Sequence, residues 1–120
     1  MNPFPEQRRY LRYEVLDYAT IRMEGDMDTW SGMVVDIGLG GVQLRTKVAP
    51  EMNRSVQILV GRADGNPILL RGEVRRVEAM DGTDLWSTGI KFAPETHQER
   101  IEIAEFVHGV FQRQKEQLLR

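Results

Sequence analysis

The sequence of 120 residues contains no cysteine and no long run of apolar residues. The first absence excludes disulfides, thiolate metal sites and cysteine nucleophiles. The second argues against a membrane-spanning helix, which needs about 20 consecutive apolar residues. The first residues also lack the apolar core of a signal peptide. We therefore expect a cytoplasmic protein without membrane insertion.

An excess of positive charge is absent as well. There are 16 Lys and Arg residues against 18 Asp and Glu residues, and the net charge is −2. General nucleic-acid binding favours a strongly basic surface, so we expect no nucleic-acid partner. Basic residues do gather locally, at Arg8, Arg9 and Arg12, and this distribution suits a small anionic ligand. The length is that of one domain with one core.

Six segments show the alternation of apolar and polar residues that is typical of strands, with turn sequences between them. Such a pattern predicts a mainly β protein, an antiparallel barrel or a sandwich. The turns are expected at 24–26, at the 38–41 glycines, at 64–67 and at 81–84. The expected strands are 13–23, 30–37, 42–45, 56–60, 68–79 and 85–92.

The period of the apolar residues changes after Pro94. The segment Thr96–Glu99 has the sequence of a capping box, which starts a helix. Apolar residues follow at the helical spacing i, i+3, i+4, i+7 and i+8. They form a stripe that is expected to lie on the barrel: Ile103, Phe106, Val107, Val110 and Phe111.

Two short segments carry the chemistry. The first is Gln7–Arg12, whose arginines can bind phosphate or a guanine edge through two hydrogen bonds. The second is Asp36–Gly41, a carboxylate followed by three glycines. Its glycines are typical of a tight turn between strands that needs positive φ, whether or not a ligand binds, and they also offer bare backbone N–H groups to a ligand. Together the segments suggest a site for an anion that carries a purine edge.

These segments resemble the two-part signature of PilZ domains, RxxxR followed by [D/N]xSxxG. The resemblance continues in Val74–Val77 and Thr88–Phe92 and spans roughly residues 8–93, and the C-terminal helix suits the family. It implies a six-stranded antiparallel (split) β-barrel with a C-terminal α-helix. It divides the chain into a flexible arm (1–12), a barrel (13–93) and a helix packed on the barrel (95–120). One departure is Gly38, where the family has serine.

The resemblance also implies a function, that of a cyclic di-GMP receptor. In the family the RxxxR arginines, here Arg8 and Arg12, contact phosphates and the guanine edge. The second motif adds Asp36, Gly38 and Gly41, and the further candidates are Arg9 and Gln7. In the family, an arginine immediately before RxxxR tends to accompany an intercalated pair of ligand molecules. Here this position is Gln7, which favours one bound ligand molecule. An arm that closes over the ligand would signal to an effector protein in motility or exopolysaccharide control.

Two rival functions remain. A PilZ-like scaffold that does not bind the nucleotide and acts by protein contact is favoured by Gly38. A barrel for single-stranded nucleic acid would need a basic groove with stacking aromatics. Formation of a homodimer is left open.

Other residues give no catalytic or metal site. His97 and His108 would lie about 16 Å apart on one helix, too far to share a metal. No nucleophile motif is found, so we expect no enzyme, no metal and no cofactor besides the ligand. Trp30 and Trp86 are expected to serve packing. The neighbours Arg75 and Arg76 are expected on opposite faces of a strand.

Overall fold

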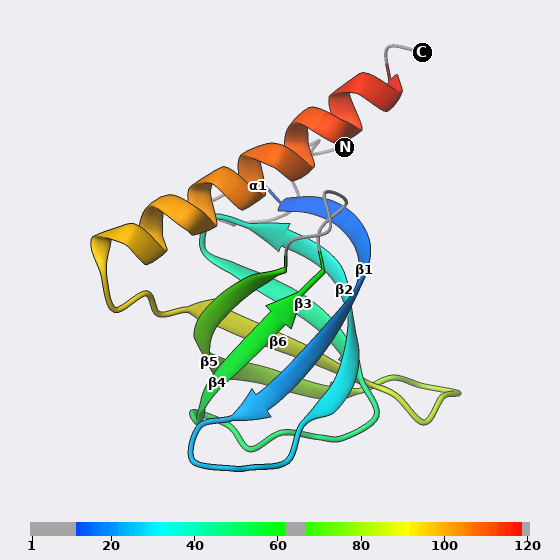
Figure 1. The fold of residues 1–120 in the computed structure, drawn as a ribbon. Coiled ribbons are helices and arrows are strands. Elements are labelled where there is room, and N and C mark those ends of the chain that lie inside the picture. Colours follow the sequence, from blue (N-terminus) through cyan, green and yellow to red (C-terminus); the bar gives the residue numbers. More distant parts are fainter. Residues whose placement is uncertain (1–11, 62–66, 119–120) are drawn as a thin grey trace, which may run out of the picture.

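The structure is a computed structural model. It describes the backbone of residues 12–61 and 67–118, and their side chains except those of residues 12–17, 114 and 117–118. In this part of the chain six strands precede one helix (Figure 1). They are β1 (Arg12–Met23), β2 (Trp30–Gly38), β3 (Gly41–Thr46), β4 (Ser55–Val60), β5 (Ile68–Ala79), β6 (Trp86–Phe92) and α1 (His97–Leu118).

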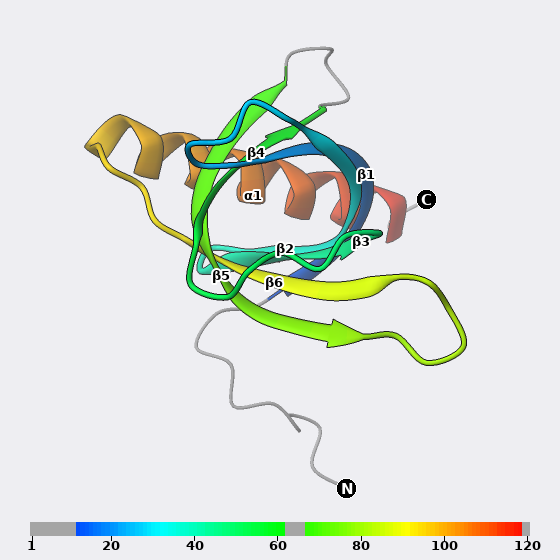
Figure 2. The ribbon, with the colours of Figure 1, turned by 90° about the horizontal axis from the view of Figure 1, so that it is seen from below.

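The six strands form one closed barrel in the order β1-β2-β3-β6-β5-β4, and β4 pairs back onto β1. All neighbouring strands are antiparallel. Figure 2 looks into the barrel and shows α1 crossing its far end. The predicted barrel is therefore confirmed, and the sandwich is not formed.

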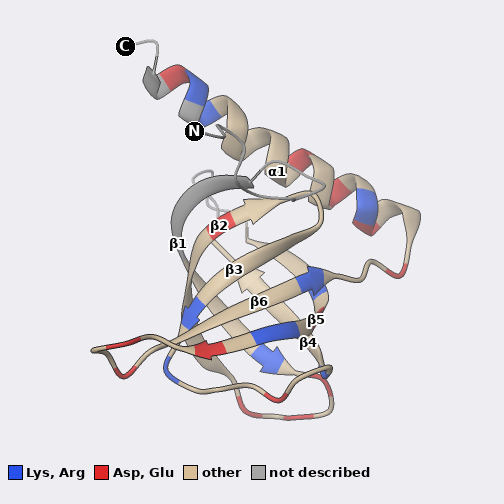
Figure 3. Cartoon of the chain, turned by 180° about the vertical axis from the view of Figure 1, so that it is seen from behind, with Lys and Arg blue, Asp and Glu red and all other residues tan. Residues whose placement is uncertain are grey.

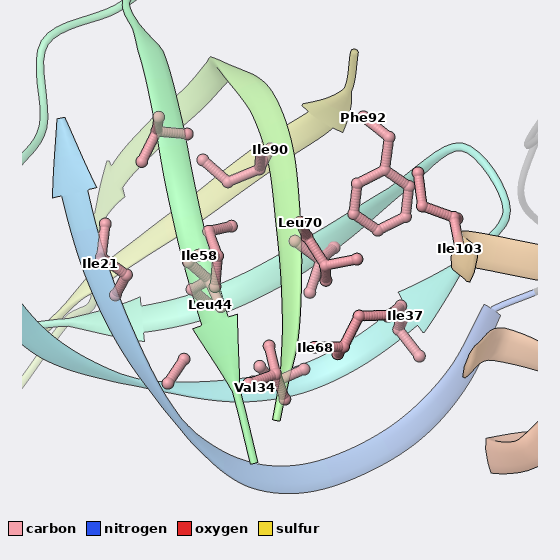
Figure 4. Packing of buried hydrophobic residues seen from close by; sticks show 14 of the residues in the cluster. Ile21, Val34, Ile37, Leu44, Ile58, Ile68, Leu70, Ile90, Phe92 and Ile103 are labelled. Atoms are coloured by element: carbon pink, nitrogen blue, oxygen red, sulfur yellow. The ribbon is translucent and has the colours of Figure 1, made fainter. Parts of the chain in front are cut away.

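The core fills the barrel through the alternation that the sequence predicted. On β4, Val56, Ile58 and Val60 are buried, whereas Leu59 between them is 43% exposed. Burial of one such aliphatic side chain contributes about 1.5–3 kcal/mol. Figure 4 shows that every strand contributes to this core, with side chains that include Ile21, Val34, Leu44, Ile58, Leu70 and Ile90.

Helix α1 closes one end of the barrel with its apolar stripe. Ile103, Phe106, Val107 and Val110 are buried in the core, and Ile103 lies beside Phe92 of β6 (Figure 4). Phe111 departs from the prediction: it is 37% exposed, because it lies at the flank of the stripe, 100° around the helix from Val110. Within the described ranges, no helix is long and apolar enough to cross a membrane.

The start of α1 is fixed by the predicted capping residues. The Glu99 N–H donates to the Thr96 hydroxyl oxygen at 3.1 Å, and the Glu99 carboxylate accepts the Glu95 N–H at 2.9 Å. Glu99 also pairs with Arg71 of β5 at 3.3 Å. This ion pair ties the first turn of the helix to the barrel wall.

The strand register shifts at three places, between Glu14 and Asp17, between Val34 and Asp36, and between Val74 and Arg76. A bulge inserts one extra residue and re-aims the side chains that follow. The shift on β5 makes one prediction wrong. Arg75 and Arg76 are both exposed, instead of pointing to opposite faces, because the extra residue breaks the alternation.

The turns behave partly as expected. Gly25 and Gly82 have positive φ, 90° and 76°, in the predicted 24–26 and 81–84 turns. The predicted 64–67 turn lies largely outside the described residues. Trp30 is partly buried against the core, which agrees with a packing role.

Candidate functional site

The pairing of β1 with β2 brings the two signature segments together. Arg12 lies opposite Gly38, and Glu14 lies opposite Asp36. The second arginine of RxxxR thus begins the strand that borders the glycine motif, and the chain enters the barrel at that motif. Gln7, Arg8 and Arg9 lie outside the described residues, and Arg12 is described by its backbone only.

The bulge on β2 decides the position of Asp36. Strict alternation would put Asp36 on the same side as Val34, which is fully buried. Because the register shifts between these two residues, Ile37 takes the next buried position, and Asp36 is only partly buried. The carboxylate is thereby kept out of the apolar core.

Gly41 of the motif is required for close approach, and none of the three glycines takes left-handed backbone. A Cβ at Gly41 would lie 2.2 Å from the carbonyl oxygen of Ile90, so no side chain fits between β3 and β6 there. Among the described glycines, positive φ occurs at Gly25 and Gly82. The interpretation of the 38–41 segment as a turn that needs positive φ is therefore wrong.

A row of residues continues from Asp36 around the barrel. Asp36 lies opposite Gln43, Gln43 opposite Gly89, and Gly89 opposite Arg76. The Gln43 amide donates to the Ser87 hydroxyl. A Cβ at Gly89 would lie 3.2 Å from the Arg76 Cβ and 3.3 Å from the Gln43 Oε1, so glycine leaves a gap between these two side chains. Figure 3 shows basic segments on β3, β5 and β6, and the acidic segment of β2 lies apart from them, nearer to α1.

A cleft of about 500 Å³ adjoins the motif on the side of α1. Its walls come from the 39–40 turn, the end of β6 and the first turns of α1. Its lining residues are Leu39, Gly40, Lys91, Phe92, Pro94, Arg100, Ile103 and Ala104. Sequence reasoning did not assign Lys91 or Arg100 to a site. Lys91 stands in the Thr88–Phe92 segment that carried part of the resemblance, but Arg100 has no signal of its own.

The described residues offer no alternative metal centre. No group of three His, Asp or Glu side chains within them is arranged to hold an ion. His97 and His108 both lie on α1 and are exposed.

A family model for the PilZ domain matches residues 6–109. The chain belongs to the PilZ domain family. The match covers both signature segments, the whole barrel and the first part of α1, so the resemblance inferred from two short motifs is confirmed.

Solved structures show the same fold at low sequence identity. The PilZ domain of YcgR from Escherichia coli with cyclic di-GMP is 14% identical, with a TM-score of 0.75, over 96% of this chain and 99% of that one. The inhibitor of motility MotI from Bacillus subtilis is 13% identical, with a TM-score of 0.70, over 97% of this chain. The complex of K. pneumonia MrkH with cyclic di-GMP is 15% identical, with a TM-score of 0.74, over 93% of this chain.

The PilZ chain spans only part of two of these neighbours. It covers 57% of MotI and 56% of MrkH. No curated protein sequence matches it.

Proposed function

We propose that this PilZ protein is a receptor for cyclic di-GMP that binds the nucleotide between its N-terminal arm and the outer surface of the barrel. The observation that carries the proposal is the β1–β2 register, in which Arg12 of RxxxR lies opposite Gly38 of the second motif. Two of the structural neighbours, the YcgR domain and MrkH, are complexes with this nucleotide.

The chemistry of the two segments is complementary to the ligand. Arg8 and Arg12 supply permanent positive charge and paired N–H donors for the phosphates and for the guanine O6 and N7 edge. Asp36, kept outside the core, is an acceptor for guanine N–H groups. Gly38 and Gly41 carry no side chain that would hold a ligand away from the backbone.

Binding would order the arm on the barrel and create a new surface for an effector protein. Order–disorder of a charged segment on binding a phosphate ligand is a common switching device. From the family resemblance, we expect the effector protein to act in motility or exopolysaccharide control. The proposed activity is binding and not catalysis.

A second candidate is a scaffold that does not bind the nucleotide and acts by protein contact. The observation in its favour is Gly38, which lacks the serine hydroxyl of the family motif. One lost hydrogen bond costs about 0.5–1.5 kcal/mol, which weakens ligand binding without abolishing it. We therefore favour the receptor.

Titration calorimetry with cyclic di-GMP, GTP and a short oligonucleotide tests both candidates. The receptor binds cyclic di-GMP selectively, and Asp36→Ala weakens this binding without lowering the melting temperature of the apo protein. Absence of heat with all three ligands would favour the scaffold. Binding of the oligonucleotide alone would favour the nucleic-acid barrel.

A further inference from the structure

The cleft between the barrel and α1 has apolar walls from both. Leu39 and Phe92 line it from the barrel, and Ile103 and Ala104 line it from α1. Leu39 belongs to the Asp36–Gly41 motif and is 50% exposed. The cleft is thus continuous with the motif, and its volume of about 500 Å³ is in the range of small-molecule sites.

Two cations also line the cleft, Lys91 from the end of β6 and Arg100 from the first turns of α1. Neither forms an ion pair with a residue that the structure describes. The carboxylates nearest to them in register or sequence are already engaged. Glu73 lies opposite Lys91, and Glu99 precedes Arg100, but each pairs with an arginine of β5. The positive charge in the cleft is therefore not neutralised by these two neighbours.

Four of the other surface cations contrast with this pair, although Arg45, Lys47 and Lys115 also lack an ion pair with a described residue. Arg54, Arg71, Arg75 and Arg76 all pair with carboxylates on the described surface. A cleft that combines two unpaired cations with apolar walls is suited to an anion attached to a flat ring. The cations bind the anion, and the ring packs against the apolar walls.

We propose that this cleft is the second half of the nucleotide site, where Lys91 and Arg100 bind a phosphate and the exposed Leu39 contacts a purine face. The inference rests on the proposed cyclic di-GMP function and extends it by two ligand-binding residues. The ligand then spans from the signature motif to α1. Binding is transmitted to the helix directly, in addition to any ordering of the arm.

The first test removes the two charges and measures cyclic di-GMP affinity by calorimetry. Lys91→Ala/Arg100→Ala lowers the affinity by about tenfold or more, because charge-assisted hydrogen bonds are lost. The difference from wild type shrinks in high salt, since exposed charges are screened. The control is Lys47→Ala/Lys115→Ala, which removes the same charge from exposed positions outside the cleft lining and leaves the affinity within about twofold of wild type.

The second test fills the cleft without changing charge. Ala104→Phe places a ring in the cleft and lowers the affinity, whereas Gln98→Phe, at an exposed position of the same helix outside the cleft lining, does not. Melting temperatures of the apo variants show that both fold.

The outcomes separate this inference from the proposed function. If Lys91→Ala/Arg100→Ala and Ala104→Phe both bind cyclic di-GMP with wild-type affinity, the cleft inference is overturned and the proposed receptor function stands. A wild-type protein that does not bind cyclic di-GMP overturns both.

Discussion

The two ends of the barrel differ in how their charged side chains are used. At the end opposite α1, Arg54 donates to the Glu24 carbonyl oxygen at 3.0 Å and lies 3.6 Å from Asp26 and 3.9 Å from Glu51. These contacts join the 24–29 and 47–54 loops, which lie at the end of the barrel opposite α1 (Figure 1). At the α1 end, Lys91 and Arg100 line a cleft without such partners among the described residues.

The loops differ in the same way. The turns opposite α1 are closed by their own hydrogen bonds, such as that of the Thr83 hydroxyl to the Met80 carbonyl oxygen at 2.9 Å. They take left-handed backbone at Gly25 and Gly82. The 39–40 turn beside α1 instead exposes Leu39 and borders a cleft. The end opposite α1 is closed by internal hydrogen bonds and ion pairs, whereas the α1 end has the Arg71–Glu99 pair and, beside it, two cations in a cleft without a carboxylate partner among the described residues.

The largest effect is expected from Gly41→Ala, which inserts a Cβ 2.2 Å from the Ile90 carbonyl oxygen. The β3–β6 pairing must shift, so the free energy of unfolding falls by about 1–3 kcal/mol or more. Chemical denaturation measures it. Gly61→Ala is the control, because no atom lies within 4 Å of its added Cβ. Equal stability of both variants would show that β3 does not need close approach at this position.

The next largest contrast is expected between the RxxxR arginines, Arg8 and Arg12, and Arg22 near the far end of β1. Arg8→Ala and Arg12→Ala each weaken cyclic di-GMP binding by about 1–3 kcal/mol, the contribution of a two-pronged contact to guanine. Arg22→Ala, on the same strand at the far end, loses only its 2.6 Å hydrogen bond to Gln57 and keeps full affinity. Calorimetry compares the affinities of the three variants. Loss of affinity in Arg22→Ala alone would place the ligand at the end of the barrel opposite α1.

Arg54→Ala probes the structural end. It removes the hydrogen bond to the Glu24 carbonyl oxygen, which contributes about 0.5–1.5 kcal/mol, and leaves cyclic di-GMP affinity unchanged. Thermal melting and calorimetry of the same sample give both values. A drop in affinity with unchanged melting would contradict the division between the two ends.

The smallest effect is expected from Gly38→Ser, which adds the hydroxyl of the family motif. Since positive φ in the described glycines is confined to Gly25 and Gly82, serine at position 38 meets no left-handed strain. We expect binding to tighten by about 0.5–1.5 kcal/mol with unchanged melting. A lower melting temperature without a gain in affinity would mean that the buried position of Gly38 leaves no room for a side chain.

Local patterns were enough to predict the elements. Val56, Ile58 and Val60 face the core because every second residue of a strand does, whatever strand lies beside it. Thr96 and Glu99 begin α1 because a capping box needs only its own backbone. Two short motifs were also enough to identify the family, because the residues of each motif lie close together in the sequence.

The sequence by itself thus determined the six strands, the helix and the segments that carry the chemistry. Only the tertiary structure decided which face each critical residue takes and which residues meet. The bulges after Val34 and Val74 appear only in the pairing of β2 with β3 and of β5 with β6, and they bring Asp36 and Arg76 to the outer surface against strict alternation. Gly41 is fixed by the Ile90 backbone of β6, and the cleft joins Leu39 to Arg100 across 61 positions of the chain. Periodicity describes one segment at a time, whereas these positions depend on how separate segments pack.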